Sequence, residues 1–274
     1  MAKIASIHSF GGGNDTRLAA NLVVSIAQLG YRIGVLDTGT QGPSIHDYFG
    51  LDSELTDSAW NAHVWEYDLT YDHVHDGHGN GGVVAFNYAN EVRLLPPFLT
   101  EGKGEIAVMG RGIYLVPFTI RASDISQALR DGYAVEPLRD GIAHFAERLH
   151  LDYLLIDTHP GTTEETVFSI ALSDTLLVVL RPDQLEYQET AVTVEIGRQL
   201  HVPKILLVVH NVPADYDITT VHEQVENIFN TVVAGVLPSS IAAETTGGPS
   251  IFCRQHGDHP WSQQIASIAR QIIE

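Results

Sequence analysis

The sequence predicts an α/β protein with a single doubly wound, mainly parallel sheet and helices on both faces. Short apolar runs of strand length alternate with segments of helical periodicity along the whole chain. A glycine-rich turn joins the first apolar run to the first helical segment. Hydrophobic residues make up 44% of the 274 residues, which is enough to bury a large core. We therefore expect one domain spanning residues 1–274, with about seven or eight strands.

Each predicted element follows from the spacing of its apolar residues. Apolar runs predict strands at residues 3–8, 32–37, 112–117, 153–157, 175–180, 204–210 and 232–236. Apolar residues three and four positions apart predict helices at residues 16–29, 123–130, 137–149, 164–172, 184–199, 221–229 and 261–273. Strands that alternate with helices in this way are typical of a parallel sheet, because parallel strands need a crossover connection.

Residues 52–111 depart from the alternation. They contain many polar and aromatic residues and two glycine clusters, with little periodicity. Since this stretch is longer than an ordinary connection, we expect an elaborated or partly mobile segment. Within it we expect short helices near residues 58–66 and exposed loops near residues 76–82 and 100–104.

The same segment holds a histidine-rich motif, with His73, His75 and His78 close to Asp72 and Asp76. One interpretation is a Zn²⁺ or Ni²⁺ site, because His73 and His75 would share one face of an extended chain. The other is a solvated polar loop. We favour the loop, because the motif has neither a cysteine nor two histidines at helical spacing.

The charge balance limits the possible partners. The chain has 15 lysines and arginines against 34 aspartates and glutamates, a formal charge of −19. An acidic surface repels phosphate backbones and anionic lipids, so we expect neither nucleic acid nor membrane as a partner. The apolar runs fall short of a membrane span, the amino terminus lacks a secretion signal, and Cys253 is the lone cysteine. These features predict a soluble cytoplasmic protein.

The final predicted helix carries Trp261, Ile265, Ile268 and Ile272 on one face. An amphipathic helix that binds anionic lipid needs a basic polar face, whereas this helix has only Arg270 as a cation. We therefore expect the stripe to pack in the core.

Four segments at the ends of predicted strands carry the chemical motifs. The first runs from Ser9 through Gly11, Gly12 and Gly13 to Arg17, where backbone N–H groups can wrap a phosphate. The others are Asp37–Ser44, Leu155–Gly161 and Leu177–Gln184. Together the four segments resemble the MinD/ParA family of P-loop ATPases, over roughly residues 3–50 and from residue 111 to the end.

The resemblance implies ATP and Mg²⁺ as cofactors if the phosphate site functions, and a protein of the spatial-positioning or partition type that acts as a nucleotide-gated dimer. It implies Thr16 and Asp157 as Mg²⁺ ligands. The nucleotide-binding residues that it implies are Gly11, Gly12, Gly13, Asn14, Asp15, Thr16, Arg17, Asp37, Gly161, His210 and Asn211.

The phosphate loop nevertheless departs from the family pattern, which has two lysines. Without a gap, Phe10 matches the first lysine, Asp15 the P-loop lysine and Thr16 the metal-binding hydroxyl. A match shifted by one residue places Gly11, Thr16 and Arg17 at these positions, so neither register restores a lysine. An aspartate beside phosphates opposes nucleotide binding through like-charge repulsion.

Two further positions depart from the family. Gly39 stands where the family has a second aspartate that positions the attacking water, and His210 stands at the adenine-binding asparagine, with Asn211 one place later. His159 has no partner that the sequence places, so we assign no catalytic residue.

We therefore expect a degenerate member of the family, a binding or regulatory module with little or no ATPase activity. Surviving glycines and strand-end aspartates also serve turns and caps, so they do not require a ligand. The rival interpretation is an active ATPase with a non-standard cradle, in which Arg17 or Arg181 replaces the missing cation. We expect a homodimer or a mixed dimer with a related chain, and an unidentified protein partner or cargo.

Overall fold

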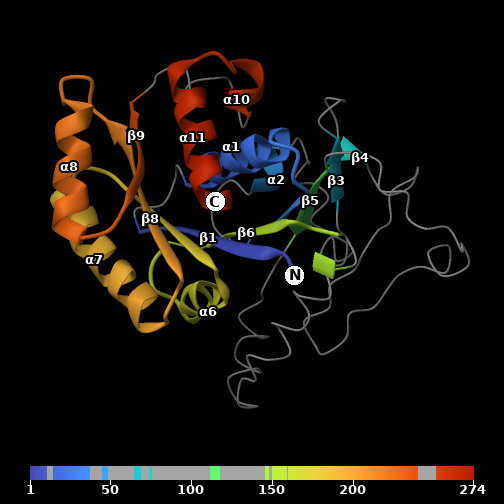
Figure 1. Cartoon of the computed structure of the whole chain (residues 1–274), viewed down its shortest axis with the longest axis horizontal. Helices are drawn as coiled ribbons and strands as arrows, with labels where there is room; N and C mark the ends of the chain where they lie inside the picture. Colours follow the sequence, from blue (N-terminus) through green and yellow to red (C-terminus); the bar gives the residue numbers. More distant parts are fainter. Residues whose placement is uncertain are drawn as a thin grey trace, which may run out of the picture.

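A computed structural model describes residues 1–10, 15–37, 45–48, 65–68, 74–75, 112–117, 146–147, 150–158, 160–239 and 251–274. Within these residues, nine strands form one sheet in the order β4-β3-β5-β2-β6-β1-β7-β8-β9 (Figure 1). The strands are β1 Lys3–Ser9, β2 Ile33–Asp37, β3 Trp65–Asp68, β4 Val74–His75, β5 Gly112–Pro117, β6 Tyr153–Asp157, β7 Thr175–Leu180, β8 Lys204–Val212 and β9 Val233–Pro238.

All pairings from β5 to β9 in that order are parallel, which confirms the predicted α/β fold with a mainly parallel sheet. Every strand that the sequence predicts is present, with ends that differ by at most two residues. The nine described strands exceed the expected seven or eight because β3 and β4 add an antiparallel edge beside β5.

The prediction of short helices near residues 58–66 is wrong at its end, since Trp65 and Glu66 belong to β3. In this strand Trp65 lies opposite Leu115 of β5, and Tyr67 lies opposite Ile113. Aromatic residues alternate here with acidic ones, and this period-two pattern suits a strand that can pair with an open sheet edge. The loops expected near residues 76–82 and 100–104, like His73 and His78, lie outside the described residues, while His75 ends β4.

The helices are α1 Asp15–Gln28, α2 Ile45–Tyr48, α6 Glu164–Leu172, α7 Gln184–Gln199, α8 Ile218–Phe229, α10 Phe252–Gln255 and α11 Pro260–Ile273. The bounds of α6 and α7 match the prediction. α8 begins three residues earlier than expected, because the Asp217 side chain caps it by accepting from the Thr220 N–H at 2.9 Å. Of the helices predicted at 123–130 and 137–149, the structure describes only residues 146–147, which are helical.

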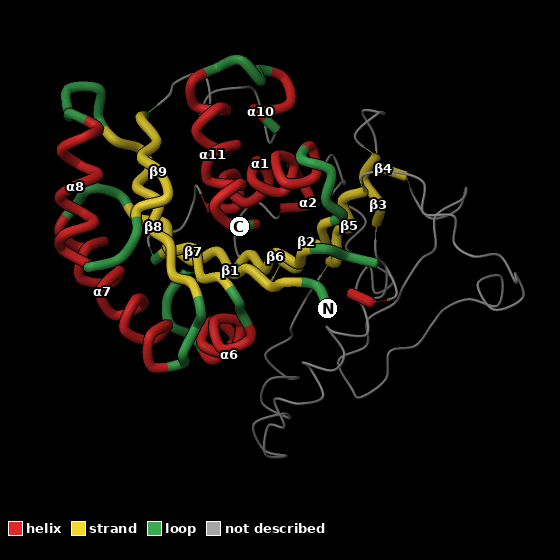
Figure 2. The backbone as a smooth tube through the Cα atoms, in the orientation of Figure 1, coloured by secondary structure: helices red, strands yellow, loops and turns green. Residues whose placement is uncertain are grey.

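Helices cover both faces of the sheet, as predicted. α1, α2, α10 and α11 lie on one face, and α6, α7 and α8 lie on the other (Figure 2). Side chains of β7 alternate between the two faces. Leu177 and Val179 pack in the core under α1 and α11, whereas Leu176, Val178 and Leu180 pack in the core under α6, α7 and α8.

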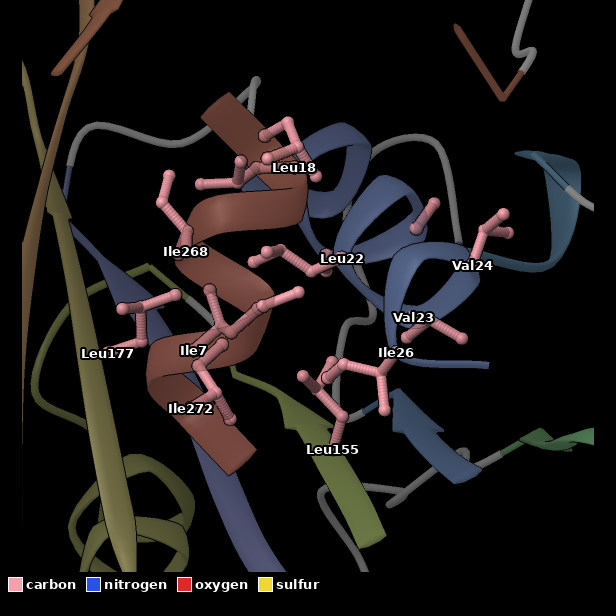
Figure 3. Close-up of a cluster of buried hydrophobic side chains, with 14 of the residues drawn as sticks. Ile7, Leu18, Leu22, Val23, Val24, Ile26, Leu155, Leu177, Ile268 and Ile272 are labelled. Atoms are coloured by element: carbon pink, nitrogen blue, oxygen red, sulfur yellow. The ribbon is translucent and has the colours of Figure 1, made fainter. Parts of the chain in front are cut away.

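The final helix packs in the core, as expected. Trp261, Ile265, Ile268 and Ile272 are each at most 8% exposed. Figure 3 shows Ile268 and Ile272 of α11 beside Leu22 of α1 and Ile7 of β1. Full burial of one such side chain contributes about 1.5–3 kcal/mol. Among the described helices, none is long and apolar enough to cross a membrane.

Candidate functional site

The motif-bearing segments meet at the carboxyl edge of the sheet. Asp37 and Asp157 lie at the same level on β2 and β6, and Asp157 lies opposite Ile7 of β1. α1 begins at Asp15, directly after the glycine run that leaves β1. Gly11, Gly12, Gly13, Asn14 and the side chains of Asp15 and Asp37 lie outside the described residues. The described backbone therefore places two strand-end aspartates at the carboxyl edge where β1 also ends, and α1 follows β1 along the chain.

Asp157 is a buried acid at this edge, with an exposed fraction of 3%. Thr16 and Arg17 occupy the first turn of α1 and are half-buried. A carboxylate and a hydroxyl are oxygen ligands of the kind that Mg²⁺ takes. The metal part of the implied site thus has suitable donors, and its role as a metal site stays a prediction.

A buried histidine lies next to the aspartate motif. The Thr158 hydroxyl donates to the Ile7 carbonyl at 2.8 Å and lies 2.8 Å from His8 Nδ1. Because a hydroxyl has one proton, His8 Nδ1 is the donor in the second contact, which assigns the proton to that nitrogen. The contact links β1 to the residue that follows β6.

The segment after β6 turns sharply at Gly161, where φ is +85°. That backbone conformation favours glycine, since a side chain there would be strained. Two residues later Thr163 caps α6, its side chain accepting from the Thr166 N–H at 3.3 Å. Gly161 is therefore explained by turn geometry, whether or not a ligand binds. His159 lies outside the described residues.

Arg181 follows β7 and forms an ion pair within its own segment. Its Nε and Nη2 lie 3.2 and 2.9 Å from Glu186 Oε1, and its Nε lies 3.7 Å from Asp183 Oδ2. The Glu186 side chain is 4% exposed, whereas that of Arg181 is 44% exposed. The guanidinium therefore compensates a buried carboxylate at the start of α7.

His210 and Asn211 lie near the end of β8, where the pairing with β9 shifts register. Asn211 has a left-handed backbone, with φ of 54°, a conformation that asparagine tolerates better than most residues. Burial and the nearby Arg181 charge lower the pKa of His210 from 6.5 to about 4. At neutral pH His210 is therefore uncharged and adds no cation to this edge.

The described lysines lie at the opposite edge of the sheet. Lys3 and Lys204 are the first residues of β1 and β8, and Lys204 Nζ donates to the Gln271 carbonyl at 3.0 Å. Lys103 lies outside the described residues. Neither Lys3 nor Lys204 stands where a phosphate bound at the glycine turn would need it.

Cys253 is buried between helices. It lies in α10, 4% exposed, and its backbone N–H donates to Asn21 Oδ1 of α1 at 2.8 Å. Burial raises the pKa of its thiol to about 11, although hydrogen bonds with Ser262 and Ser25 oppose the rise. Among the described residues, no group of three or more His, Cys, Asp and Glu side chains is placed to hold a metal ion.

The sequence interpretation missed Glu186 and His8. A signal for Glu186 was present, since Asp183 followed three residues later by a glutamate is the pattern of a capped helix start. Asp183 Oδ1 indeed accepts from the Glu186 N–H at 3.0 Å. His8 had no such signal, because a histidine inside an apolar strand shows its partner only in three dimensions.

Comparison with known proteins finds relatives that are named for iron-sulfur clusters and one that is named for ATP binding, although no family model matches the chain. The iron-sulfur cluster carrier protein of Pyrococcus furiosus is 25% identical over 214 residues, which cover 75% of this chain and 60% of that protein. A cytosolic Fe-S cluster assembly factor of Chaetomium globosum is 31% identical over 176 residues, 64% of this chain and 46% of that protein. An uncharacterised ATP-binding protein of Methanocaldococcus jannaschii is 23% identical and covers 98% of this chain and 87% of its own. The chain thus spans about 60% of the length of the Pyrococcus carrier.

Solved structures show the same fold. The cell division ATPase MinD of Pyrococcus furiosus superimposes with a TM-score of 0.65 at 18% identity, over 99% of this chain and 98% of its own. The MinC:MinD complex of Aquifex aeolicus gives a TM-score of 0.66 at 17% identity, over 98% and 95%. The ParA of pNOB8, bound to nonspecific DNA, gives 0.63 at 15% identity, over 100% and 98%. The chain therefore has the MinD-like P-loop fold.

Proposed function

We propose that this chain, which has the MinD/ParA-like fold, is a binding or regulatory module of the spatial-positioning or partition type with little or no ATPase activity. The observation that carries the proposal is the ion pair between Arg181 and the buried Glu186. Phosphoryl transfer needs a cation, a metal and a positioned water together. The pair already engages Arg181, one of the two arginines that could replace the missing cation.

The sequence of the phosphate loop supports the same proposal. Phe10 and Asp15, or Gly11 and Thr16 in the shifted register, stand where the family has its lysines. In the unshifted register Asp15 sets a negative charge where phosphate oxygens would lie, which disfavours the bound state. The donor set therefore fits a metal ion better than it fits a triphosphate.

If Arg181 gave its full charge to a phosphate by leaving Glu186, a buried carboxylate would lose its cation. Breaking one partner out of a buried ion pair costs about 3–5 kcal/mol, and solvent around the half-exposed guanidinium lowers that cost. A phosphate would have to offset this loss before it gained any net affinity. The rival function, an ATPase that uses Arg181, is disfavoured for this reason.

Cluster carriage, the function named for several relatives, is not part of the proposal. Iron-sulfur clusters are held mainly by cysteine thiolates, commonly four of them. These 274 residues contain one cysteine, and burial holds its thiol in the protonated form. The chain by itself lacks the ligands for such a cargo.

The expected partner is a second copy or a related chain that meets the carboxyl edge without nucleotide. Phe10, which replaces the lysine of the unshifted register, is 37% exposed at the end of β1. An apolar side chain there favours a constitutive contact over a nucleotide-gated one. Light scattering with and without ATP tests this, and a dimer that forms only with ATP favours the active rival.

Nucleotide binding and turnover test the main proposal directly. We expect no Mg²⁺-dependent ATP hydrolysis above background, and no thermal stabilisation by ATP at concentrations up to several millimolar. A ligand at about 100 times its dissociation constant would add about 2.7 kcal/mol to stability. The matched control is Asp157→Ala: turnover in the parent that disappears in this variant would refute the proposal.

A further inference from the structure

Side chains from both layers of helices bond to β9, and those of α8 do so at its outer edge. β9 is the last strand of the described sheet, and Leu207 of β8 donates its N–H to the Val232 carbonyl. Leu207 lies opposite Val233 in the parallel pairing. Backbone groups of successive residues point to alternate sides of a strand, so the N–H and C=O of Val233 point away from β8.

Two side chains of α8 form hydrogen bonds with these outward groups of Val233. Glu226 Oε1 accepts from the Val233 N–H at 3.3 Å, and His222 Nε2 lies 3.1 Å from the Val233 carbonyl. A carbonyl only accepts, so His222 donates from Nε2. His222 and Glu226 are four residues apart, so they share a side of α8, while Val221, Val225 and Phe229 pack on the sheet.

A third side chain reaches β9 from the opposite layer. Gln271 Nε2 of α11 donates to the Ala234 carbonyl at 2.7 Å. The backbone of Gln271 in turn accepts from Lys204 at the start of β8. Helices on both faces of the sheet thus supply bonds to the first residues of β9.

Exposed apolar side chains lie beside the outer edge of β9, so an uncovered edge could pair with another chain. Val232 is 53% exposed directly before β9, and Ile228 of α8 is 58% exposed. An open strand edge flanked by apolar side chains is a template for pairing with another chain. A second copy of this protein offers the same edge, and two identical edges can pair antiparallel about a two-fold axis.

We propose that His222 and Glu226 close the edge of β9 at Val233 against strand pairing, and that removing them turns β9 into a pairing surface for a second copy of this chain. Each of the two side chains holds a backbone group of Val233 that an added strand would otherwise contact. The proposal concerns the edge farthest along the sheet from β5 and does not depend on whether nucleotide binds.

The test compares the oligomeric state of His222→Ala/Glu226→Ala with that of the parent, by light scattering over a hundred-fold concentration range. We expect the variant to associate beyond the parent state at concentrations where the parent does not change. Glu223→Ala is the matched control, because Glu223 is exposed on the same helix and carries the same charge. A folded double variant with the mass of the parent at every concentration overturns the proposal.

Hydrogen exchange provides a second measurement that does not depend on association. In Glu226→Ala the Val233 amide should exchange at least ten-fold faster than in the parent, while the Leu207 amide stays protected. Glu226→Gln keeps an acceptor oxygen and should resemble the parent. If the double variant fails to fold, equal Val233 exchange in Glu226→Ala and Glu226→Gln overturns the proposal.

Discussion

The amino edge of the sheet, where the parallel strands begin, and the carboxyl edge, where they end, differ in what their charged side chains contact. At the amino edge the Arg32 N–H donates to Asp152 Oδ2 at 2.8 Å, and its guanidinium carbon lies 4.9 Å from the centre of the Tyr114 ring. Lys204 donates there to the end of α11. At the carboxyl edge, Arg181 compensates Glu186, Asp157 is buried and His210 is neutral. At the amino edge the cations Arg32 and Lys204 thus contact groups of other elements. At the carboxyl edge Arg181 forms an ion pair with Glu186 of its own segment.

At the described carboxyl edge Asp37 and Asp157 end neighbouring strands, while an ion pair with Glu186 engages Arg181. A strand-to-helix turn offers N–H groups and a helix dipole, but a polyanion also needs compensating side-chain charge. The ion pair of Arg181 and the neutral state of His210 therefore bear directly on whether this edge can bind a polyanion.

The largest expected effect is a loss of stability on acidification caused by His210. Its folded pKa of about 4 lies below the ordinary 6.5, so the unfolded chain takes up a proton first as the pH falls. The stability that this group contributes is complete above pH 6.5 and declines between about 6.5 and 4, by up to about 3 kcal/mol. Denaturant unfolding of the parent and of His210→Gln at several pH values measures the difference. Parallel curves for the two proteins would contradict the assignment.

Removal of Arg181 should have the next largest effect. Arg181→Ala leaves Glu186 buried without its cation, and we expect a loss of about 2 kcal/mol, less than for a fully buried pair because Arg181 is half-exposed. The same variant should raise the pKa of His210, since the Arg181 charge is one cause of its depression. Urea unfolding and NMR titration measure the two effects. Arg181→Ala/Glu186→Gln serves as the control and should recover part of the lost stability.

A smaller effect is expected at the amino edge. Lys204→Ala removes the bond from Nζ to the Gln271 carbonyl, so a loss of about 0.5–1.5 kcal/mol should follow. Lys204 lies at the amino end of β8, whereas the glycine run follows the carboxyl end of β1. The response to ATP should therefore not change. A Lys204 variant that alters nucleotide binding would show that the two edges are coupled.

No gain is expected from restoring one lysine. Asp15→Lys should leave ATP hydrolysis at background, because the first lysine and the water-positioning aspartate would still be absent. A phosphate-release assay with Mg²⁺ measures this. Turnover in Asp15→Lys would show that the rest of the site is competent and that Asp15 alone silences it.

The sequence by itself determined the parts of the structure that depend on local periodicity. Apolar runs at residues 112–117, 153–157 and 175–180 became strands with the predicted bounds, and the stripe of α11 is buried. These patterns are legible because side chains alternate along a strand and repeat about every 3.6 residues along a helix. The MinD-like fold followed from the same patterns and from the motifs at the strand ends.

Only the tertiary structure decided where side chains from distant segments meet. Residues 65–68 became strand β3 beside β5, whose open edge supplies the backbone partners. Their period-two pattern suits a strand but does not indicate which strand it pairs with. His8 pairs with Thr158 across 150 residues, and Gln271 reaches Ala234 from another layer. The ion pair of Arg181 and Glu186 is local in sequence, yet the burial of Glu186 comes from packing of the whole domain. Burial and long-range contacts are properties of the assembled chain, so the charge balance of the site could be weighed only in three dimensions.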